Sequence, residues 1–286
     1  MLGSELTNGL ANLNYNIYAN DINFTYKIAK VKNIKLLKSD FLKPKKLDKL
    51  HNIDIFIHSA AITKSSRIID KKNLITTNLK LTKIALTLAK KFKTKKFFLI
   101  SSSSVYRNYE ALIYNERSKI LGKDAYSKSK IMSEKLCRLF CTKNNIQFTI
   151  LRIGNIYNGF EMSKWSRKNV SIIQQWLNSF KKNRSLKTNS FNVRRDWTFI
   201  EDIPKAIHNI IKNDNNFKIL NLVSPYICKD IDIMKKITKD KSLFQSEYKE
   251  AKHNATSSIY MKKINFNNWT SPQRGINLIK KSYEEN

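Results

Sequence analysis

The amino-acid sequence predicts an α/β fold, with a doubly wound parallel sheet followed by a smaller C-terminal lobe. The main observation is that short apolar runs, typical of buried strands, alternate with helical patterns of about 10–15 residues through the first half of the chain. This alternation loosens after Gly154, where the lobe is expected to begin. The expected division is therefore residues 1–153 and residues 154–286, with later strands and helices returning to the sheet.

The first part of the chain is expected to hold most of the sheet. Strands are predicted at residues 16–21, 34–37, 53–58, 96–100 and 148–153. Helices are predicted at residues 5–13, 44–50 and 124–140, together with a long helix whose apolar positions from 75 to 88 share one face. Pro44 fits the first turn of its helix, because no backbone donor is needed there.

The second part of the chain has a less regular pattern. Helices are predicted at about residues 170–180, 204–211 and 230–238, and a strand at residues 219–223. The last forty residues are polar without a clear period, and the sequence predicts no element there. No apolar run is long enough to cross a membrane, and the first residues lack the basic and apolar regions of a signal peptide.

The net charge of +32 does not by itself indicate a protein that binds nucleic acid. The lysines are spread along the chain, and no basic stripe interleaved with stacking aromatic residues occurs. A solvated surface therefore explains the charge better, although this charge would attract a doubly anionic small substrate.

The three cysteines are odd in number and lack the spacing of a metal site, which indicates reduced thiols, a cytoplasmic protein and no metal.

The most informative motif is a run of serines after a predicted strand, followed by a tyrosine and a lysine four residues apart. The serines are residues 101–104, so they lie where open α/β sheets bind ligands. Tyr126 and Lys130 are one helical turn apart and share a face of the predicted helix. Hydroxyl and amine groups can therefore converge on one point, as proton transfer to and from a hydroxyl group requires.

With these motifs, the chain resembles the NAD-dependent epimerase/dehydratase family, the extended short-chain dehydrogenase/reductases that act on nucleotide sugars. A Tyr-Lys pair alone recurs by chance, but further motifs stand in family order and at family spacing. They are His58-Ser59-Ala60-Ala61, Leu151-Arg152-Ile153-Gly154-Asn155-Ile156-Tyr157, and Arg195-Asp196 leading to Glu201-Asp202. The resemblance covers nearly the whole chain and implies a Rossmann-like domain at residues 1–153 that binds NAD and a lobe at residues 154–286 that mainly binds substrate.

The resemblance implies that Ser102, Tyr126 and Lys130 are catalytic. Tyr126 takes the place of the family's acid/base. A phenol is a poor base at neutral pH, so a neighbouring ammonium is needed to favour the phenolate. Lys130 would supply that ammonium and hydrogen-bond the nicotinamide ribose, while Ser102 would hydrogen-bond the reacting oxygen. A turn with local side-chain hydrogen bonds is the alternative for the serine run.

The resemblance also implies a binding site for NAD. Besides Tyr126 and Lys130, the expected cofactor-binding residues are Gly3, Asp21, Asp40, Phe41, Ala60, Ala61 and Asn78. Asp21 follows Gly3 by eighteen residues, close to the spacing at which a carboxylate accepts bonds from the adenosine ribose. Because that carboxylate would repel a 2′-phosphate, NAD is expected rather than NADP. Asp40 could equally cap a helix, and Asn78 could be a polar helix residue.

The expected substrate is a nucleotide-diphosphate sugar, contacted by Ser102, Ser103, Asn155 and Arg195. Asn155 and Arg195 match positions that contact the diphosphate in relatives. A guanidinium suits phosphate because its forked donors pair two oxygens at once. A salt bridge from Arg195 to Asp196 or Glu201 is the alternative.

The family fingerprint begins with a strand and Gly-x-x-Gly-x-x-Gly, and only its end matches this chain, at Gly3. The fold is therefore expected to lack its first strand, so that the strands ending at Asp21 and His58 flank an empty position in the sheet. Either the true start lies upstream of Met1 or the gene is decayed, and the survival of the downstream site residues favours the first explanation.

Among the reactions of the family, the sequence favours epimerisation. Dehydratases carry an Asp-Glu pair after the catalytic Ser or Thr, and decarboxylases usually carry a Glu, but this chain has Ser103 and Ser104. We therefore expect an NAD-dependent nucleotide-sugar epimerase that acts through a transient keto-sugar. The alternatives are a keto-sugar reductase and an inactive family member that acts as a binding protein. Relatives often dimerise through the helix with the Tyr-Lys pair and the long helix before it, as a four-helix bundle. A homodimer is therefore expected, without nucleic acid or membrane partners.

Overall fold

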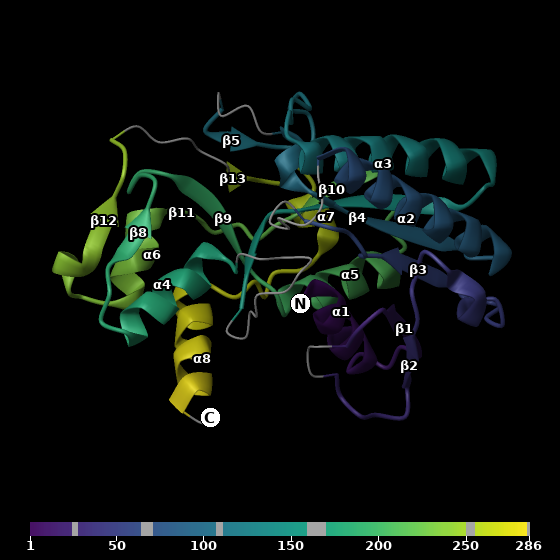
Figure 1. Ribbon diagram of the computed structural model, residues 1–286, viewed down its shortest axis with the longest axis horizontal. Coiled ribbons are helices and arrows are strands. Elements are labelled where there is room, and N and C mark those ends of the chain that lie inside the picture. Colours follow the sequence, from purple (N-terminus) through teal and green to yellow (C-terminus); the bar gives the residue numbers. More distant parts are fainter. Residues whose placement is uncertain (25–27, 64–70, 107–110, 159–169, 250–254, 285–286) are drawn as a thin grey trace.

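The computed structural model describes residues 1–24, 28–63, 71–106, 111–158, 170–249 and 255–284 (Figure 1). One part of the molecule is a parallel sheet with helices on both faces. The other part, at the left of Figure 1, is a lobe of short strands and helices. None of the helices within these ranges is long and apolar enough to span a membrane.

The main sheet has four parallel strands, in the order β10 (Ile219–Leu222), β6 (Gln147–Ile153), β4 (Lys96–Ser102) and β3 (Ile55–His58). Two further parallel strands, β1 (Ile17–Asp21) and β2 (Ile34–Lys38), pair with each other. Parallel neighbours need long crossover connections, and helices supply most of them here. The predicted α/β fold with a parallel sheet is confirmed.

The strand β4 carries buried apolar side chains on both faces of the sheet. Successive side chains of a strand point to opposite sides. Phe97 and Leu99 belong to a buried cluster on one face, whereas Phe98 and Ile100 belong to a buried cluster on the other. Burial on both faces therefore accounts for the continuous apolar run from which the sequence predicts this strand.

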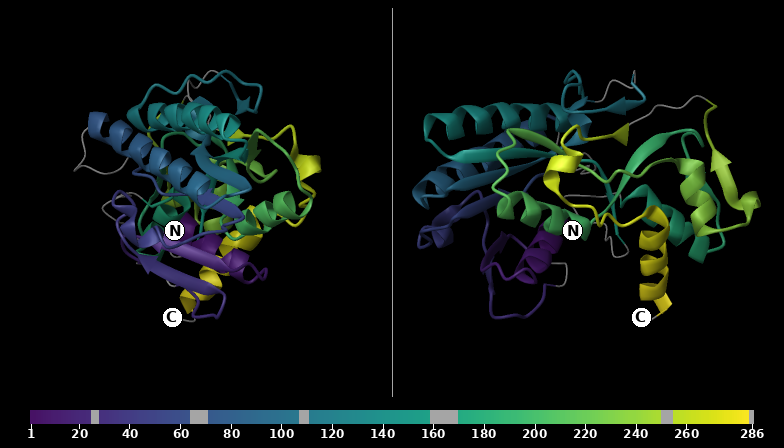
Figure 2. Two further views of the ribbon diagram at one scale, coloured as in Figure 1. Left: turned by 90° about the vertical axis from the view of Figure 1, so that its right-hand side faces the viewer. Right: turned by 180° about the vertical axis from the view of Figure 1, so that it is seen from behind.

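Two long helices, α2 (Lys71–Lys91) and α3 (Ala125–Lys143), lie side by side on one face of the main sheet (Figures 1 and 2). Cys137 and Cys141 of α3 are fully buried and pack in the same cluster as Leu99 of β4. These two thiols therefore serve as part of the core between α3 and the sheet.

The opposite face of the sheet is covered by α1 (Leu2–Ala11) and α5 (Asp202–Lys212), which contact each other. Ile203, Ile207 and Ile210 of α5 recur at helical spacing and are completely buried in the cluster that contains Phe98. The predicted helix at residues 204–211 is thus present, and it belongs to the main sheet although it lies late in the sequence.

The lobe contains a sheet of three strands, β7 (Asn155–Tyr157), β9 (Arg194–Phe199) and β11 (Ile227–Lys229). Beside it lie the pair β8 (Leu186–Thr188) and β12 (Phe244–Ser246) and the helices α4 (Ile172–Lys181), α6 (Asp230–Ile237) and α8 (Pro272–Glu284). Trp176 and Trp197 are buried at the centre of this lobe.

The remaining elements are short. They are the 3-10 helices Pro44–Leu47, Ser103–Tyr106 and Lys241–Leu243, the paired strands β5 (Ile113–Tyr114) and β13 (Ala255–Thr256), and the helix α7 (Met261–Ile264). Three of the elements, β13, α7 and α8, lie in the last forty residues, where the sequence predicts none. In α8 the buried face comprises Ile276 and Ile279 among polar residues, so the periodic signal in the sequence is weak.

The strands β1 and β3 belong to separate sheets. The backbone pairing of β1 is with β2, and that of β3 is with β4. Within the part of the chain that the structure describes, no backbone hydrogen bond joins β1 to β3. Among the described residues, therefore, no strand fills the position between the strands that end at Asp21 and His58, as the sequence predicts.

Gly154 lies between β6 and β7, and a side chain there would collide with Asp196 Oδ2 and would approach Val223 Cγ1 to 2.7 Å. We expect Gly154→Ala to lower the free energy of unfolding by about 1–3 kcal/mol, as overpacking of a core does. Urea denaturation measures the change. Gly3→Ala is the control, because its new Cβ would meet only Ser59 Oγ, at 3.3 Å. A loss no larger than that of the control would contradict this account of Gly154.

Candidate functional site

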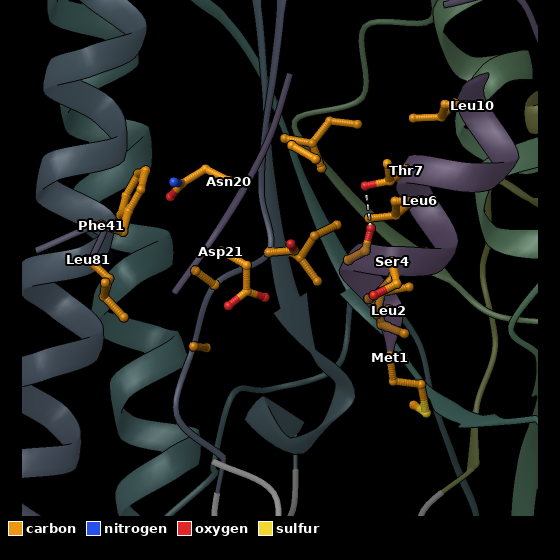
Figure 3. A pocket seen from close by; sticks show the side chains of 18 of the residues that line it. Met1, Leu2, Ser4, Leu6, Thr7, Leu10, Asn20, Asp21, Phe41 and Leu81 are labelled. Atoms are coloured by element: carbon orange, nitrogen blue, oxygen red, sulfur yellow. Dashed lines mark hydrogen bonds between the residues drawn. The ribbon is translucent and has the colours of Figure 1, made fainter. Parts of the chain in front are cut away.

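A cavity of about 1280 Å³ extends from α1 to the carboxyl ends of the main strands and on to the lobe (Figure 3). Most of the residues that the sequence predicts for the site line this cavity. They are Gly3, Asp21, Asp40, Phe41, Ala60, Ala61, Ser102, Tyr126, Lys130, Asn155 and Arg195. Asn78 and Ser103 do not line it. The fold therefore brings residues from distant parts of the chain to one space.

The first turn of α3 carries Tyr126. The side chain of Asp124 caps this helix, accepting hydrogen bonds from Ser127 N at 3.1 Å and from Ser127 Oγ at 2.9 Å. Lys130 lies one turn later and donates from Nζ to the carbonyl oxygen of Ile100 at 2.8 Å, while Nζ stands 5.8 Å from the ring centre of Tyr126. The ammonium is thus held between β4 and the tyrosine ring.

Burial controls the charge of Lys130. Removal from water lowers the pKa of Lys130 to about 8, and the negative charge of Glu134 opposes this shift. The neighbouring imidazole of His58 is also buried, and burial together with the charge of Lys130 lowers its pKa to about 3. His58 is therefore neutral at physiological pH, so Lys130 is the positive charge at this point.

Glu134 is buried and joins three elements. Its Oε1 accepts hydrogen bonds from Ser101 Oγ at 2.6 Å and from Arg152 Nε at 2.9 Å, and its Oε2 accepts from Arg152 NH2 at 2.6 Å. Arg152 NH1 also donates to the hydroxyl of Tyr106 at 2.7 Å, and this hydroxyl donates to Asn221 Oδ1 at 2.8 Å. The network ties α3 to β4, β6 and β10, and so fixes the helix that carries Tyr126.

The serine run divides between the cavity and the core. Ser102 ends β4 and lines the cavity, and its Oγ accepts a hydrogen bond from Ser104 N at 3.2 Å. Ser103 and Ser104 lie in the following 3-10 helix and are buried. Ser102 thus lines the cavity, as the sequence predicts for a group that contacts the reacting oxygen, whereas Ser103 is buried and does not line it.

At the other end of the cavity, Asp21 is exposed at the carboxyl end of β1, and Figure 3 shows its carboxylate pointing into the space. Asn20 ties β1 to its neighbour, since Nδ2 donates to the carbonyl oxygen of Leu37 at 2.7 Å. Asp40 Oδ1 accepts a hydrogen bond from Leu42 N at 2.9 Å, and the ring of Phe41 stacks on His58 with centres 6.0 Å apart. A carboxylate and an aromatic ring therefore face this end of the cavity.

Asn78 of α2 fixes the segment after β3. Its Oδ1 accepts a hydrogen bond from Ile62 N at 2.8 Å, and its Nδ2 donates to the carbonyl oxygen of Ile62 at 3.0 Å and to Ser129 Oγ at 3.0 Å. Asn78 is buried and lies outside the cavity lining. The structure therefore gives it the role of holding the loop with Ala60 and Ala61 in place.

The lobe supplies Asn155 and Arg195. The buried carboxylate of Asp196 accepts hydrogen bonds from Asn155 N at 2.9 Å and Nδ2 at 3.1 Å, and from Thr256 N at 2.9 Å. Burial raises the pKa of Asp196 to about 6, although these hydrogen bonds lower it. Arg195 points the other way along β9 and forms a two-bonded ion pair with Asp230, at 2.8 Å from Nε and 3.0 Å from NH2.

The sequence alone does not reveal that Asp230 is the partner of Arg195. The carboxylate that Arg195 pairs with is Asp230 rather than Asp196 or Glu201. Asp196 is adjacent to Arg195 in β9, so its side chain points to the opposite face, and Glu201 lies beyond the end of this strand. Asp230 reaches Arg195 through the antiparallel pairing of β9 with β11, in which Arg195 lies opposite Cys228. Glu134 has one usable signal in the sequence, its position one helical turn after Lys130.

The described residues contain no group of three or more His, Cys, Asp or Glu side chains placed to hold a metal ion. The polar groups around the cavity are a phenol, an ammonium, hydroxyls, carboxylates and a guanidinium. Such groups can hold and move protons and can bind a ligand with ribose and phosphate parts.

Comparisons with known proteins agree with this architecture. A dTDP-D-glucose 4,6-dehydratase of Dictyostelium discoideum is 25% identical over 236 residues, which cover 77% of this chain and 53% of that protein. The chain thus spans about half the length of this curated relative.

Two solved structures have the same fold. A UDP-glucose 4-epimerase from Thermotoga maritima with UDP-glucose aligns with a TM-score of 0.83 and 15% identity, over 100% of this chain and 96% of that one. A UDP-glucuronic acid 4-epimerase from Bacillus cereus in complex with NAD aligns with a TM-score of 0.78 and 20% identity, over 100% and 95%. The model of the NAD dependent epimerase/dehydratase family matches residues 1–222, most of the chain. The chain therefore belongs to the NAD dependent epimerase/dehydratase family.

Proposed function

We propose that the protein is an NAD-dependent epimerase of a nucleotide-activated sugar and acts through a transient keto-sugar. The observation that carries the proposal is that Ser102, Tyr126 and Lys130 line the same cavity as Asp21, with Lys130 Nζ 5.8 Å from the ring centre of Tyr126. The family's description as NAD dependent agrees with this arrangement. A keto-sugar reductase remains the second candidate, because the same three residues serve both reactions.

The cavity residues fit NAD in chemistry. The exposed carboxylate of Asp21 can accept hydrogen bonds from ribose hydroxyls. The small side chains of Ala60 and Ala61 allow a ligand to approach the backbone, and Lys130 and Tyr126 line the same cavity. Bound NAD would supply the acceptor and donor of hydride.

The chain's own residues would handle the proton. Tyr126 would take the proton from the sugar hydroxyl and later return it, with the ammonium of Lys130 favouring the phenolate. Ser102 Oγ would hold the reacting oxygen by a hydrogen bond. The keto-sugar would then turn over in the cavity and present its other face, so that hydride returns with inverted configuration at that carbon.

Residues of the lobe would bind the nucleotide-sugar substrate. Arg195 would face the diphosphate, with its guanidinium oriented by Asp230, and Asn155 would be oriented by Asp196. The net charge of +32 would raise the rate at which a doubly anionic nucleotide sugar meets the protein.

Epimerisation is favoured over dehydration by the residues after Ser102. The resemblance associates dehydratases with an Asp-Glu pair at this point, and Ser103 and Ser104 cannot replace it because they are uncharged and buried. The test is incubation of the protein with NAD and a panel of UDP and dTDP sugars, followed by NMR spectroscopy of the sugar. We expect a C4 epimer without accumulation of NADH. Loss of water from the sugar, or net turnover of the cofactor, would contradict the proposal.

We further infer a homodimer in which α2 and α3 meet their copies. Met132 and Leu139 are 46% and 61% exposed and lie seven residues apart, on one face of α3. Sedimentation velocity of the wild type and of the double variant Met132→Lys with Leu139→Lys tests this inference. A dimer in the first and a monomer in the second are expected, and a monomeric wild type would overturn it.

Tyr126→Phe removes only the hydroxyl that carries the proton. We expect loss of turnover with unchanged thermal unfolding, since the ring of Tyr126 and its contact with Lys130 stay. Single-turnover kinetics and calorimetry measure the two quantities. Lys128→Ala is the control on the same helix, because Lys128 is exposed and lies outside the cavity lining. Activity of Tyr126→Phe close to that of the control would remove Tyr126 from the mechanism.

The pH above which kcat falls should be set by the loss of the proton from Lys130. As the pH rises through about 8, the ammonium is lost, and kcat should fall. The charge of Glu134 raises the pKa of Lys130, so Glu134→Gln should move the alkaline limb to lower pH. Asp202→Asn is the control, a buried carboxyl whose partner is Thr270. An equal shift in both variants, or none in Glu134→Gln, would contradict the role of Glu134.

Asp21 should select the cofactor. Its carboxylate accepts bonds from ribose hydroxyls and repels a 2′-phosphate, so calorimetry should give tighter binding of NAD than of NADP. Asp21→Asn should reduce this preference, by about tenfold for each 1.4 kcal/mol lost. Asp48→Asn, which changes an exposed carboxyl outside the cavity lining, should leave this preference unchanged. An equal preference in all three proteins would place Asp21 outside the site.

A further inference from the structure

A short segment late in the chain joins the lobe to the main sheet. It comprises residues 255–259, which begin with β13, and we call it the linking segment. Figure 1 shows β13 between the two parts of the molecule, beside β5. The linking segment lies outside the cavity lining, so any part that it plays at the candidate site acts through other residues.

On the side of the lobe, the linking segment is attached to a residue of the candidate site. Thr256 N donates to Asp196 Oδ1 at 2.9 Å, and the same carboxylate accepts hydrogen bonds from Asn155 N and Asn155 Nδ2. Asp196 is completely buried, whereas Asn155 lines the cavity. The linking segment and a residue of the cavity therefore share one anchor.

On the side of the sheet, the linking segment is held by Asn221 of β10, which is completely buried. Asn221 Nδ2 donates to the carbonyl oxygen of Ser257 at 2.8 Å, and Asn221 Oδ1 accepts from the hydroxyl of Tyr106 at 2.8 Å. This hydroxyl accepts from Arg152, whose guanidinium pairs with Glu134 of α3. Hydrogen bonds therefore lead from the linking segment to the helix that carries the Tyr-Lys pair.

Glu116, which lies between β5 and α3, fastens the linking segment to β10. Its Oε1 accepts hydrogen bonds from Asn221 N at 2.8 Å and from Ser258 Oγ at 2.5 Å. Its Oε2 accepts from Ile259 N at 3.0 Å. An ionised carboxylate suits this place because it only accepts, and because its two oxygens can serve several donors at once. Glu116 itself lies outside the cavity lining.

We propose that Glu116 is a positioning residue for the reaction and that it acts through the linking segment. The inference rests on the proposed function, in which Asn155 contacts the diphosphate and Tyr126 the sugar. One substrate then bridges the lobe and α3, so its reacting carbon meets Tyr126 only if these two parts keep a fixed relation. A misplacement of about 1 Å by a residue far from the chemistry can cost about 10²-fold in rate.

Such a residue affects the whole substrate more than its parts. NAD and UDP would each still find their own binding residues if the lobe and α3 moved slightly relative to each other. The complete nucleotide sugar would bind at its diphosphate but present its reacting carbon poorly to Tyr126. Loss of the link should therefore lower kcat and leave the affinities for NAD alone and UDP alone unchanged.

The test compares the wild type with Glu116→Gln and Ser258→Ala. Glutamine has one acceptor oxygen and turns an amide towards a donor, whereas Ser258→Ala removes one hydrogen bond and keeps the charge of Glu116. We expect kcat to fall about tenfold or more in Glu116→Gln and less in Ser258→Ala. Calorimetry should show affinities for NAD and UDP within about twofold of the wild type. Glu247→Gln, an exposed residue outside the cavity lining, is the control.

Hydrogen exchange without ligand checks the link itself. In Glu116→Gln, the amides of Asn221 and of residues 255–259 should exchange about tenfold faster than in the control. Unchanged exchange, or faster exchange with unchanged kcat, would overturn the proposal. Equal losses of kcat and of both affinities would show a purely structural role and would also overturn it. Faster exchange in Glu116→Gln, with no epimerisation by the wild type, would support the link and overturn only the proposed function.

Discussion

The buried ion pair of Glu134 with Arg152 joins α3 to the main sheet, and the placement of the candidate site depends on it. Both charges are almost fully removed from water, and each is held by more than one hydrogen bond. Removing one partner of such a pair costs about 3–5 kcal/mol, a large share of the roughly 5–15 kcal/mol that stabilises a typical protein. The helix that carries Tyr126 and Lys130 is therefore positioned by the interior of the protein rather than by the cavity.

The same carboxylate adjusts the electrostatics of the site. Burial alone would drive Lys130 towards its neutral form, whereas Glu134, one turn further along α3, favours the ammonium. The resulting pKa of about 8 leaves Lys130 mostly charged at neutral pH. Glu134 thus anchors the helix and also favours the charge on Lys130 that the proposed chemistry of Tyr126 would require.

Local patterns in the sequence predict the parts of the fold that are determined locally. The apolar run of β4 and the spacing of Tyr126 and Lys130 predict their elements well, because burial on two faces and helical periodicity leave strong signals. Roles set by contacts between distant residues are not visible in this way. Asn78 holds a loop, Ser103 is buried, and Arg195 pairs with Asp230, and each of these depends on a tertiary contact. The helix α8 is missed because its apolar face is narrow.

The central claim is that hydride leaves the sugar and returns to the same carbon within one cavity. The most direct measurement uses a nucleotide sugar with deuterium at the reacting carbon, incubated with the protein and unlabelled NAD. Mass spectrometry and NMR spectroscopy then follow the label. The account predicts that the epimer keeps its deuterium and that the free cofactor gains none. Deuterium in released NADH, or its exchange with solvent, would contradict the account.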